Sequence, residues 1–94
     1  MKYKVKTKVE TITTNTILQS EDFGGWQAVN VGDTPVNVNG VILKPDGKVI
    51  GLDYTTLHPN VVWDEPIRIV FFADGGTNPM VIVTRLKYIE NESK

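Results

Sequence analysis

Acid–base and nucleophilic chemistry has few candidate residues in this chain. His58 is the only histidine, and Ser20 and Ser93 are the only serines. A serine nucleophile needs a neighbouring base, and no motif in the sequence connects either serine with His58. Because Pro59 follows His58 directly, we interpret this histidine as a loop residue rather than as a general base.

The carboxylates are also poorly spaced for catalysis. Glu21 and Asp22 are adjacent, as are Asp64 and Glu65, and neighbouring side chains of a strand point to opposite faces of the sheet. Neither pair therefore forms an acid–base couple. The segment 74–78 only loosely resembles a calcium loop, which needs closely repeated oxygen ligands. The chain also has no cysteine, which excludes a thiolate metal site and a cysteine nucleophile. From the histidine, serine, carboxylate and cysteine patterns together, we expect no enzyme activity, no metal site and no cofactor.

Three aromatic residues indicate a different kind of chemistry. Trp26, Tyr54 and Trp63 could stack on sugar rings if the fold exposed them together in a cleft. Large aromatic side chains are equally typical of an ordinary core. A carbohydrate-binding β-module is therefore the alternative function, and it requires these side chains to be exposed.

Lysine occupies every second position near the N-terminus, at Lys2, Lys4, Lys6 and Lys8. In a strand this period places all four on one face and Tyr3, Val5, Thr7 and Val9 on the other. Such a stripe could follow a phosphate backbone, but interleaved aromatic residues are limited to Tyr3. Edge protection is the favoured interpretation, because lysines on an edge strand prevent pairing with another sheet. With a net charge of −1, nucleic acid is not an expected partner.

A sheet rather than a set of helices must position these side chains. About a third of the 94 residues are Val, Ile or Thr, and only two are Ala; pleated sheets favour branched side chains, whereas helices favour Ala and Leu. The length predicts one domain, residues 1–94, with 91–94 as a polar tail. No apolar run approaches the ~20 residues that span a bilayer, and no signal peptide is recognisable. We therefore expect synthesis in a cytoplasm and no membrane partner.

Alternation and turn residues predict about seven short strands, which is typical of an antiparallel β-sandwich, Ig-like or jelly-roll-like. In the strand 26–31, Val29 and Val31 are expected to face inward and Asn30 outward. The segment 53–66 has no clear period and is expected to be a long loop, with one helical turn near 55–57. The sequence therefore predicts an all-β fold.

Asn39-Gly40 is the clearest local signal. It separates two alternating apolar runs, and both residues tolerate the positive φ of a type I′ turn. The turn predicts that Val38 faces Val41 and that Val36 faces Leu43, all on the core side.

The last two apolar segments, 67–72 and 80–90, are predicted to form a hairpin with a wide loop between them. Both faces of this hairpin are apolar in the middle, and a small sandwich has nothing spare to cover the second face. An exposed apolar face is typical of a subunit contact, so we expect a homo-oligomer interface there; burial inside a covered sheet is the alternative. The candidate interface residues are Arg68, Val70, Phe72, Val81, Val83 and Arg85.

Residues 30–47, NVGDTPVNVNGVILKPDG, resemble a recurring pattern. Small structural proteins of tailed bacteriophages, especially those of the crAss-like group that infect Bacteroidetes, carry N-x-G-x-x-x-V-x-V-N-G-x-x-L-x-P-G before an aromatic-rich return strand. Here Asp46 precedes the last glycine, a departure of one residue, and the similarity spans roughly residues 26–72.

The resemblance implies a non-enzymatic virion structural protein, such as a capsid auxiliary or decoration protein, a head fibre or a tail component. Its partners would be other copies of itself and other virion proteins, and it would be made in the host cytoplasm. An OB-like nucleic-acid binder is a weaker third hypothesis because of the net charge.

Overall fold

Eight β-strands and no helix make up the described part of the chain. The computed structural model describes residues 3–19, 23–45, 51–53, 63 and 65–90. The strands are β1 (Tyr3–Ile12), β2 (Thr16–Leu18), β3 (Gly25–Asn30), β4 (Val36–Val38), β5 (Val41–Leu43), β6 (Gly51–Asp53), β7 (Ile67–Phe71) and β8 (Val81–Glu90). The all-β prediction is confirmed. The predicted polar tail, the helical turn at 55–57 and His58 lie outside the described residues.

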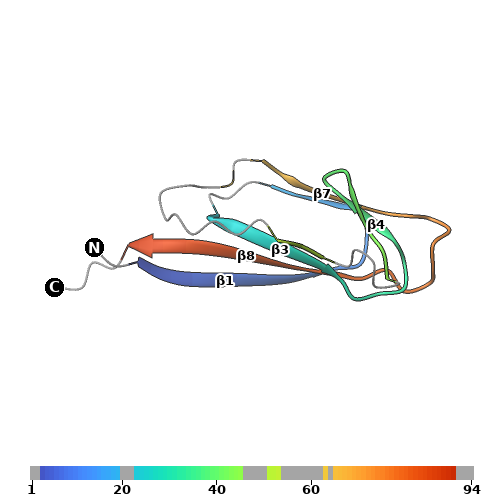
Figure 1. Cartoon of the computed structure of the whole chain (residues 1–94), viewed down its shortest axis with the longest axis horizontal. Coiled ribbons are helices and arrows are strands. Elements are labelled where there is room, and N and C mark those ends of the chain that lie inside the picture. Colours follow the sequence, from blue (N-terminus) through green and yellow to red (C-terminus); the bar gives the residue numbers. More distant parts are fainter. Residues whose placement is uncertain (1–2, 20–22, 46–50, 54–62, 64, 91–94) are drawn as a thin grey trace.

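The strands form two four-stranded antiparallel sheets that pack as a sandwich (Figure 1). Sheet A has the order β1-β8-β3-β6, and sheet B has the order β2-β7-β4-β5. The molecule is elongated, with extents of 54 × 22 × 18 Å. Much of the length comes from the ten-residue ladder between β1 and β8, in which Tyr3 pairs with Glu90 and Ile12 with Val81.

The core lies between the two sheets and is almost entirely aliphatic. Full burial of each such side chain contributes about 1.5–3 kcal/mol to stability. Sheet A contributes Ile12, Trp26, Ala28, Val81 and Val83, and sheet B contributes Leu18, Val36, Val38, Leu43, Ile67 and Ile69.

The Asn39-Gly40 hairpin forms as predicted. Asn39 has φ 49° and Gly40 has φ 92°, and the register pairs Val36 with Leu43 and Val38 with Val41. The tip is also pinned to β7, because the Asn39 Oδ1 accepts a hydrogen bond of 2.7 Å from the main-chain N–H of Arg68. The turn therefore sets the register of β4 and β5 and fixes them against their neighbour.

The predicted hairpin between the last two strands is wrong. β7 pairs with β2 and β4 in sheet B, whereas β8 pairs with β1 and β3 in sheet A. The connection between them crosses from one sheet to the other and is held by the loop after β3: Met80 O accepts from the main-chain N–H of Val31 and of Gly32, at 3.0 and 3.1 Å. A ten-residue β8 finds a longer ladder with β1 than five-residue β7 could give it.

The predicted orientation of the strand at 26–31 is also wrong. Asn30 is buried, and Val29 and Val31 are exposed. Burial of this amide is tolerated because all its polar groups are used: Nδ2 donates to Thr34 O at 2.9 Å and to Leu43 O at 3.0 Å, and Oδ1 accepts from the N–H of Gly32 at 3.0 Å. Buried amides with full hydrogen bonding carry little penalty.

Candidate functional site

The described carboxylates do not assemble an acid–base site. Asp33 has the most contacts, and all of them are structural: its Oδ1 accepts from the N–H of Asn78 at 2.7 Å, and its Oδ2 accepts from the N–H of Thr77 at 3.2 Å. These bonds, led by the one from Asn78, hold the pKa of the Asp33 carboxyl below its ordinary value. The Asp33 carboxylate thus holds the loop 74–78 by hydrogen bonds against the loop that follows β3.

The described residues also do not bring potential metal ligands together. Within them, no group of three or more His, Cys, Asp or Glu side chains lies close enough to hold an ion. The same part of the chain contains no helix long and apolar enough to cross a membrane.

The aromatic residues do not form the platform that a sugar site requires. Trp26 is only 1% exposed and belongs to the core. Trp63 packs against it edge to face, with ring centroids 5.6 Å apart and an interplanar angle of 79°. Tyr54 lies outside the described residues. Trp26 is therefore a packing residue, and it lacks the exposure that the alternative sugar-binding function requires.

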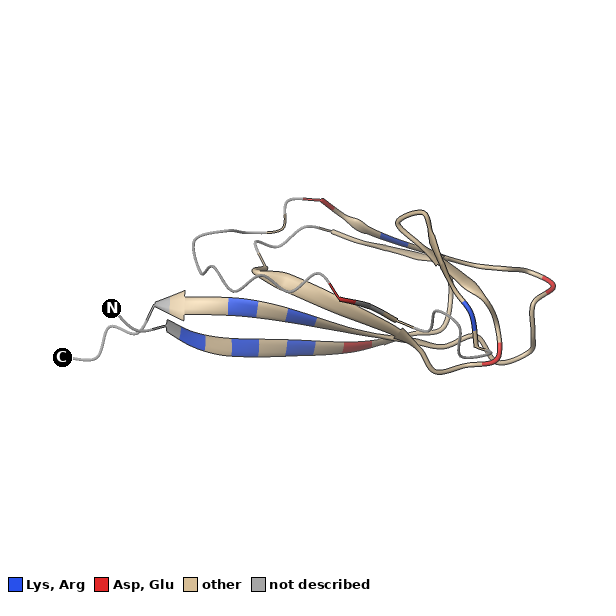
Figure 2. Ribbon diagram, in the orientation of Figure 1, with Lys and Arg blue, Asp and Glu red and all other residues tan. Residues whose placement is uncertain are grey.

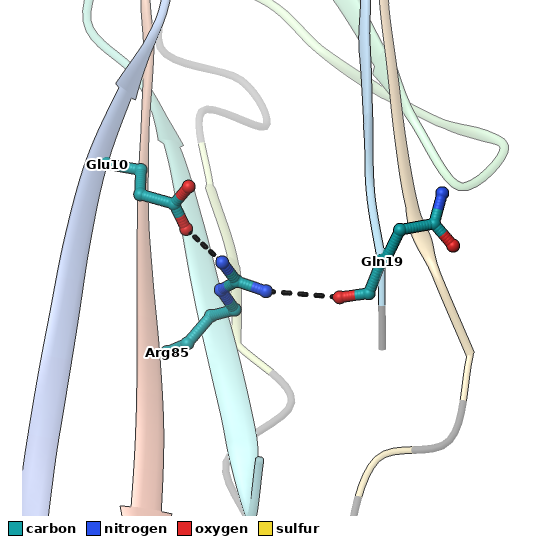
Figure 3. A network of polar contacts seen from close by, with 3 residues as sticks. All are labelled: Glu10, Gln19 and Arg85. Carbon is teal, nitrogen blue, oxygen red and sulfur yellow. Dashed lines mark hydrogen bonds and ion pairs between the residues drawn. The ribbon is translucent and has the colours of Figure 1, made fainter. Parts of the chain in front are cut away.

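Half of the predicted interface residues lie inside the molecule. Val81 and Val83 are fully buried because β8 is an inner strand of sheet A and they face the core. Arg85 is 3% exposed, and its side chain extends into the space between the sheets (Figure 3). The three residues cannot form one face with Arg68, Val70 and Phe72, because the two sets belong to different sheets.

Arg85 is held by groups from three directions. Nη2 pairs with the Glu10 carboxylate of β1, and Nη1 donates to the main-chain oxygen of Gln19 at 3.2 Å. Its guanidinium carbon lies 4.4 Å from the centroid of the Phe23 ring, a cation–π contact. The role of Arg85 is therefore structural. Sequence reasoning missed Glu10, because its proximity to Arg85 depends on the register of β1 against β8, which no local sequence pattern gives.

The remaining predicted interface residues are exposed on the outer side of sheet B. Val70 and Phe72 are 41% and 42% exposed, and Arg68 is exposed as well. Ile17 of β2 and Ile42 of β5 are exposed too. We call Ile17, Ile42, Arg68, Val70 and Phe72 the sheet-B outer face. A shallow depression of about 460 Å³ lies in this region, lined by Asn15, Thr16, Ile17, Arg68, Ile69 and Val70.

A second exposed surface follows β1. Residues 4–9 are exposed on both sides of the strand, and Val9 is 62% exposed. Lys4, Lys6 and Lys8 share the side of the sheet that carries Arg85, and Lys87 of β8 lies opposite Lys6. Figure 2 shows these basic residues together on β1 and β8, toward the end of the molecule where the termini lie.

Comparison of the chain with protein-family models, with curated proteins and with solved structures found no match.

Proposed function

We propose that the protein is a non-enzymatic structural component of a virion, made in the host cytoplasm and acting through contacts between its surface and other proteins. The observation that carries this proposal is the sheet-B outer face, where Ile17, Ile42, Val70 and Phe72 are exposed. Ile17 lies opposite Arg68, and Asn37 lies between Val70 and Ile42 in the ladder. Exposed apolar side chains that gather on one face are typical of protein–protein contacts. The pattern of residues 30–47, which resembles that of small phage structural proteins, is the reason for proposing a virion rather than another assembly.

The composition of this face suits a protein contact. Aromatic residues and arginine are enriched at interfaces, whereas lysine and glutamate are depleted. Phe72 and Arg68 fit that pattern, and Asn37, which lies between Val70 and Ile42 on the same side, is uncharged. The simplest partner is a second copy of the chain in a closed cyclic oligomer, with a capsid or tail protein as the further contact.

Light scattering of the purified full chain tests the self-contact. The wild type is expected to form an oligomer, and Phe72→Asp is expected to release folded monomers, because it places a charge in the proposed apolar contact. Thr13→Asp introduces the same charge at an exposed position outside the face and should leave the oligomer intact. A wild-type monomer, or equal disruption by both variants, would refute self-assembly through this face.

Fractionation tests the virion assignment itself. After nuclease treatment of a lysate from producing cells, the protein should sediment with nuclease-resistant particles in a fixed ratio to the major capsid protein. Recovery solely in the slowly sedimenting fraction would contradict a virion role.

A further inference from the structure

The edge strands of the two sheets differ greatly in length. Sheet B ends in β2 and β5, which have three residues each, and one edge of sheet A is β6, of which three residues are described. Short edges are one way in which proteins avoid the addition of a foreign strand. The other edge of sheet A is β1, with ten residues, and none of the described strands pairs with its outer side.

β1 also presents two chemically different sides to anything that pairs with it. Lys4, Lys6 and Lys8 project on one side, and Val5 and Val9, which are 54% and 62% exposed, project on the other. Opposite residues of neighbouring antiparallel strands project on the same side and interact directly. A strand added to this edge would therefore place alternate side chains beside lysine and beside valine.

One of these lysines has a like charge opposite it in the ladder between β1 and β8. Lys6 lies directly opposite Lys87, and both side chains are exposed. Like charges at opposite positions destabilise a sheet, so this pair opposes folding of the free chain. An anionic group beside Lys6 on the open edge of β1 would offset part of this repulsion.

The same lysines disfavour pairing with a second copy of β1. A two-fold axis perpendicular to the sheet joins two identical edges antiparallel and keeps corresponding sides together, so lysine would face lysine. The edge is thus open to strand addition yet selects against its own copy, which is how repulsive elements produce specificity.

We propose that β1 is a docking edge for an extended strand of a different protein, one that alternates Asp or Glu with β-branched or apolar residues. The acidic side chains would lie beside Lys4, Lys6 and Lys8, and the others beside Val5 and Val9. Main-chain hydrogen bonds supply affinity in this mode of recognition, and alternate side chains supply specificity. The proposal names a partner class for an assembly protein and in that sense rests on the proposed function, but it uses a different surface.

Binding of short synthetic peptides to the full-length chain tests the proposal. The first peptide alternates Glu with Val and Thr; the second has Lys in place of Glu; the third has the first peptide's composition with the glutamates grouped; the fourth is the first with alternate backbone nitrogens methylated. Fluorescence anisotropy should show binding of the first peptide. Each of the other three peptides should have a dissociation constant at least about tenfold higher. Amide NMR shifts should be centred on residues 4–9.

Variants of the chain sharpen the test. Lys6→Thr should weaken binding of the acidic peptide about 1.5- to 5-fold, as expected for loss of one cross-strand charge pair. The double variant Lys4→Glu/Lys6→Glu should prefer the lysine peptide. Lys44→Thr removes an exposed lysine that follows β5 and should leave binding unchanged.

Two results would overturn the proposal. Equal binding of the grouped or methylated peptide would show simple charge attraction without strand pairing. Tighter binding of a single-stranded oligonucleotide, with shifts at the same amides, would show a nucleic-acid surface instead. Oligomerisation through Phe72 is measured separately, so failure of the peptide test and failure of the proposed function are distinguishable.

Discussion

Arg85 of β8 donates a hydrogen bond from Nη1 to the main-chain oxygen of Gln19, directly after β2, and so links the two sheets through one side chain (Figure 3). The link lies where the aliphatic core ends. Val81 and Val83 precede Arg85 on the same side of β8, and Lys87 follows it. Along one face of one strand, the environment therefore changes from apolar core to buried ion pair to solvent.

Replacing Arg85 by methionine should destabilise the protein by about 1.5–3 kcal/mol, the usual contribution of hydrogen bonds to a charged group. The substitution leaves the half-buried Glu10 carboxylate without this guanidinium. Urea unfolding measures the change. Lys87→Met, two residues further along the same face but exposed, should cost no more than about 0.5 kcal/mol. Equal effects of the two variants would show that the ion pair contributes nothing.

The Asn39-Gly40 turn makes Gly40 sensitive to branched substitution. Gly40→Val should destabilise the fold by about 1 kcal/mol or more, because a β-branched residue resists the φ of 92° observed there. Asn39→Asp is the control, since it keeps the oxygen that accepts from Arg68 N–H and loses only the longer, exposed hydrogen bond of 3.4 Å from Nδ2 to Pro66 O. Thermal unfolding should rank Gly40→Val well below both Asn39→Asp and the wild type; a Gly40→Val protein as stable as the control would contradict the turn assignment.

Asn30→Asp should be destabilising by about 1–3 kcal/mol at neutral pH. It replaces an NH₂ group that donates to Thr34 O and Leu43 O with an oxygen that faces both carbonyls. This carboxyl would be harder to ionise when folded, so its pKa would be raised and the variant should regain stability as the pH falls. Asn37→Asp is matched to it, because Asn37 uses its oxygen as an acceptor for Gly40 N–H. An Asn30→Asp protein as stable as Asn37→Asp would disprove the assigned amide orientation.

Asp33 should show the opposite pH dependence. Its pKa is lowered in the folded state by hydrogen bonds, first of all from Asn78, so its contribution is present above the unfolded pKa of about 3.9 and is lost as the pH falls through the lower folded value. Protection of the Thr77 and Asn78 amides from hydrogen exchange, measured relative to the intrinsic exchange rate at each pH, should decrease in that acid range. Asp33→Asn should remove this pH dependence, and protection that stays constant down to the acid limit in the wild type would contradict this role of Asp33.

Local chemistry explains which parts of the fold were predictable. The hairpin around Asn39-Gly40 was predicted with its register, because a two-residue turn and alternating valines determine it within a few residues. The partner of β8 was not, since the choice between β7 and β1 depends on a ladder between segments far apart in sequence. The alternation of lysine predicted an edge strand, and β1 is one.

The candidate surface was predicted in part for the same reason. Val70 and Val81 stand in similar sequence patterns, yet Val70 is exposed and Val81 is fully buried. The difference arises because β7 and β8 lie in different sheets, and the position of each strand decides which of its sides faces the core. Asn30 and Arg85 were expected to face outward because they are polar. Their burial depends on acceptors at Thr34, Leu43, Glu10 and Gln19, which no local pattern reveals.

The ladder of β1 and β8 has a consequence for biosynthesis. It joins the first described strand to the last, so Tyr3 can pair with Glu90 only after almost the whole described chain has been synthesised. Contacts so distant in sequence are slow to form. β1, with its alternating valines, would emerge from the ribosome long before its partner and remain unpaired during that interval. The lysines between those valines then disfavour aggregation of the nascent chain, in addition to pairing of the finished edge with its own copy.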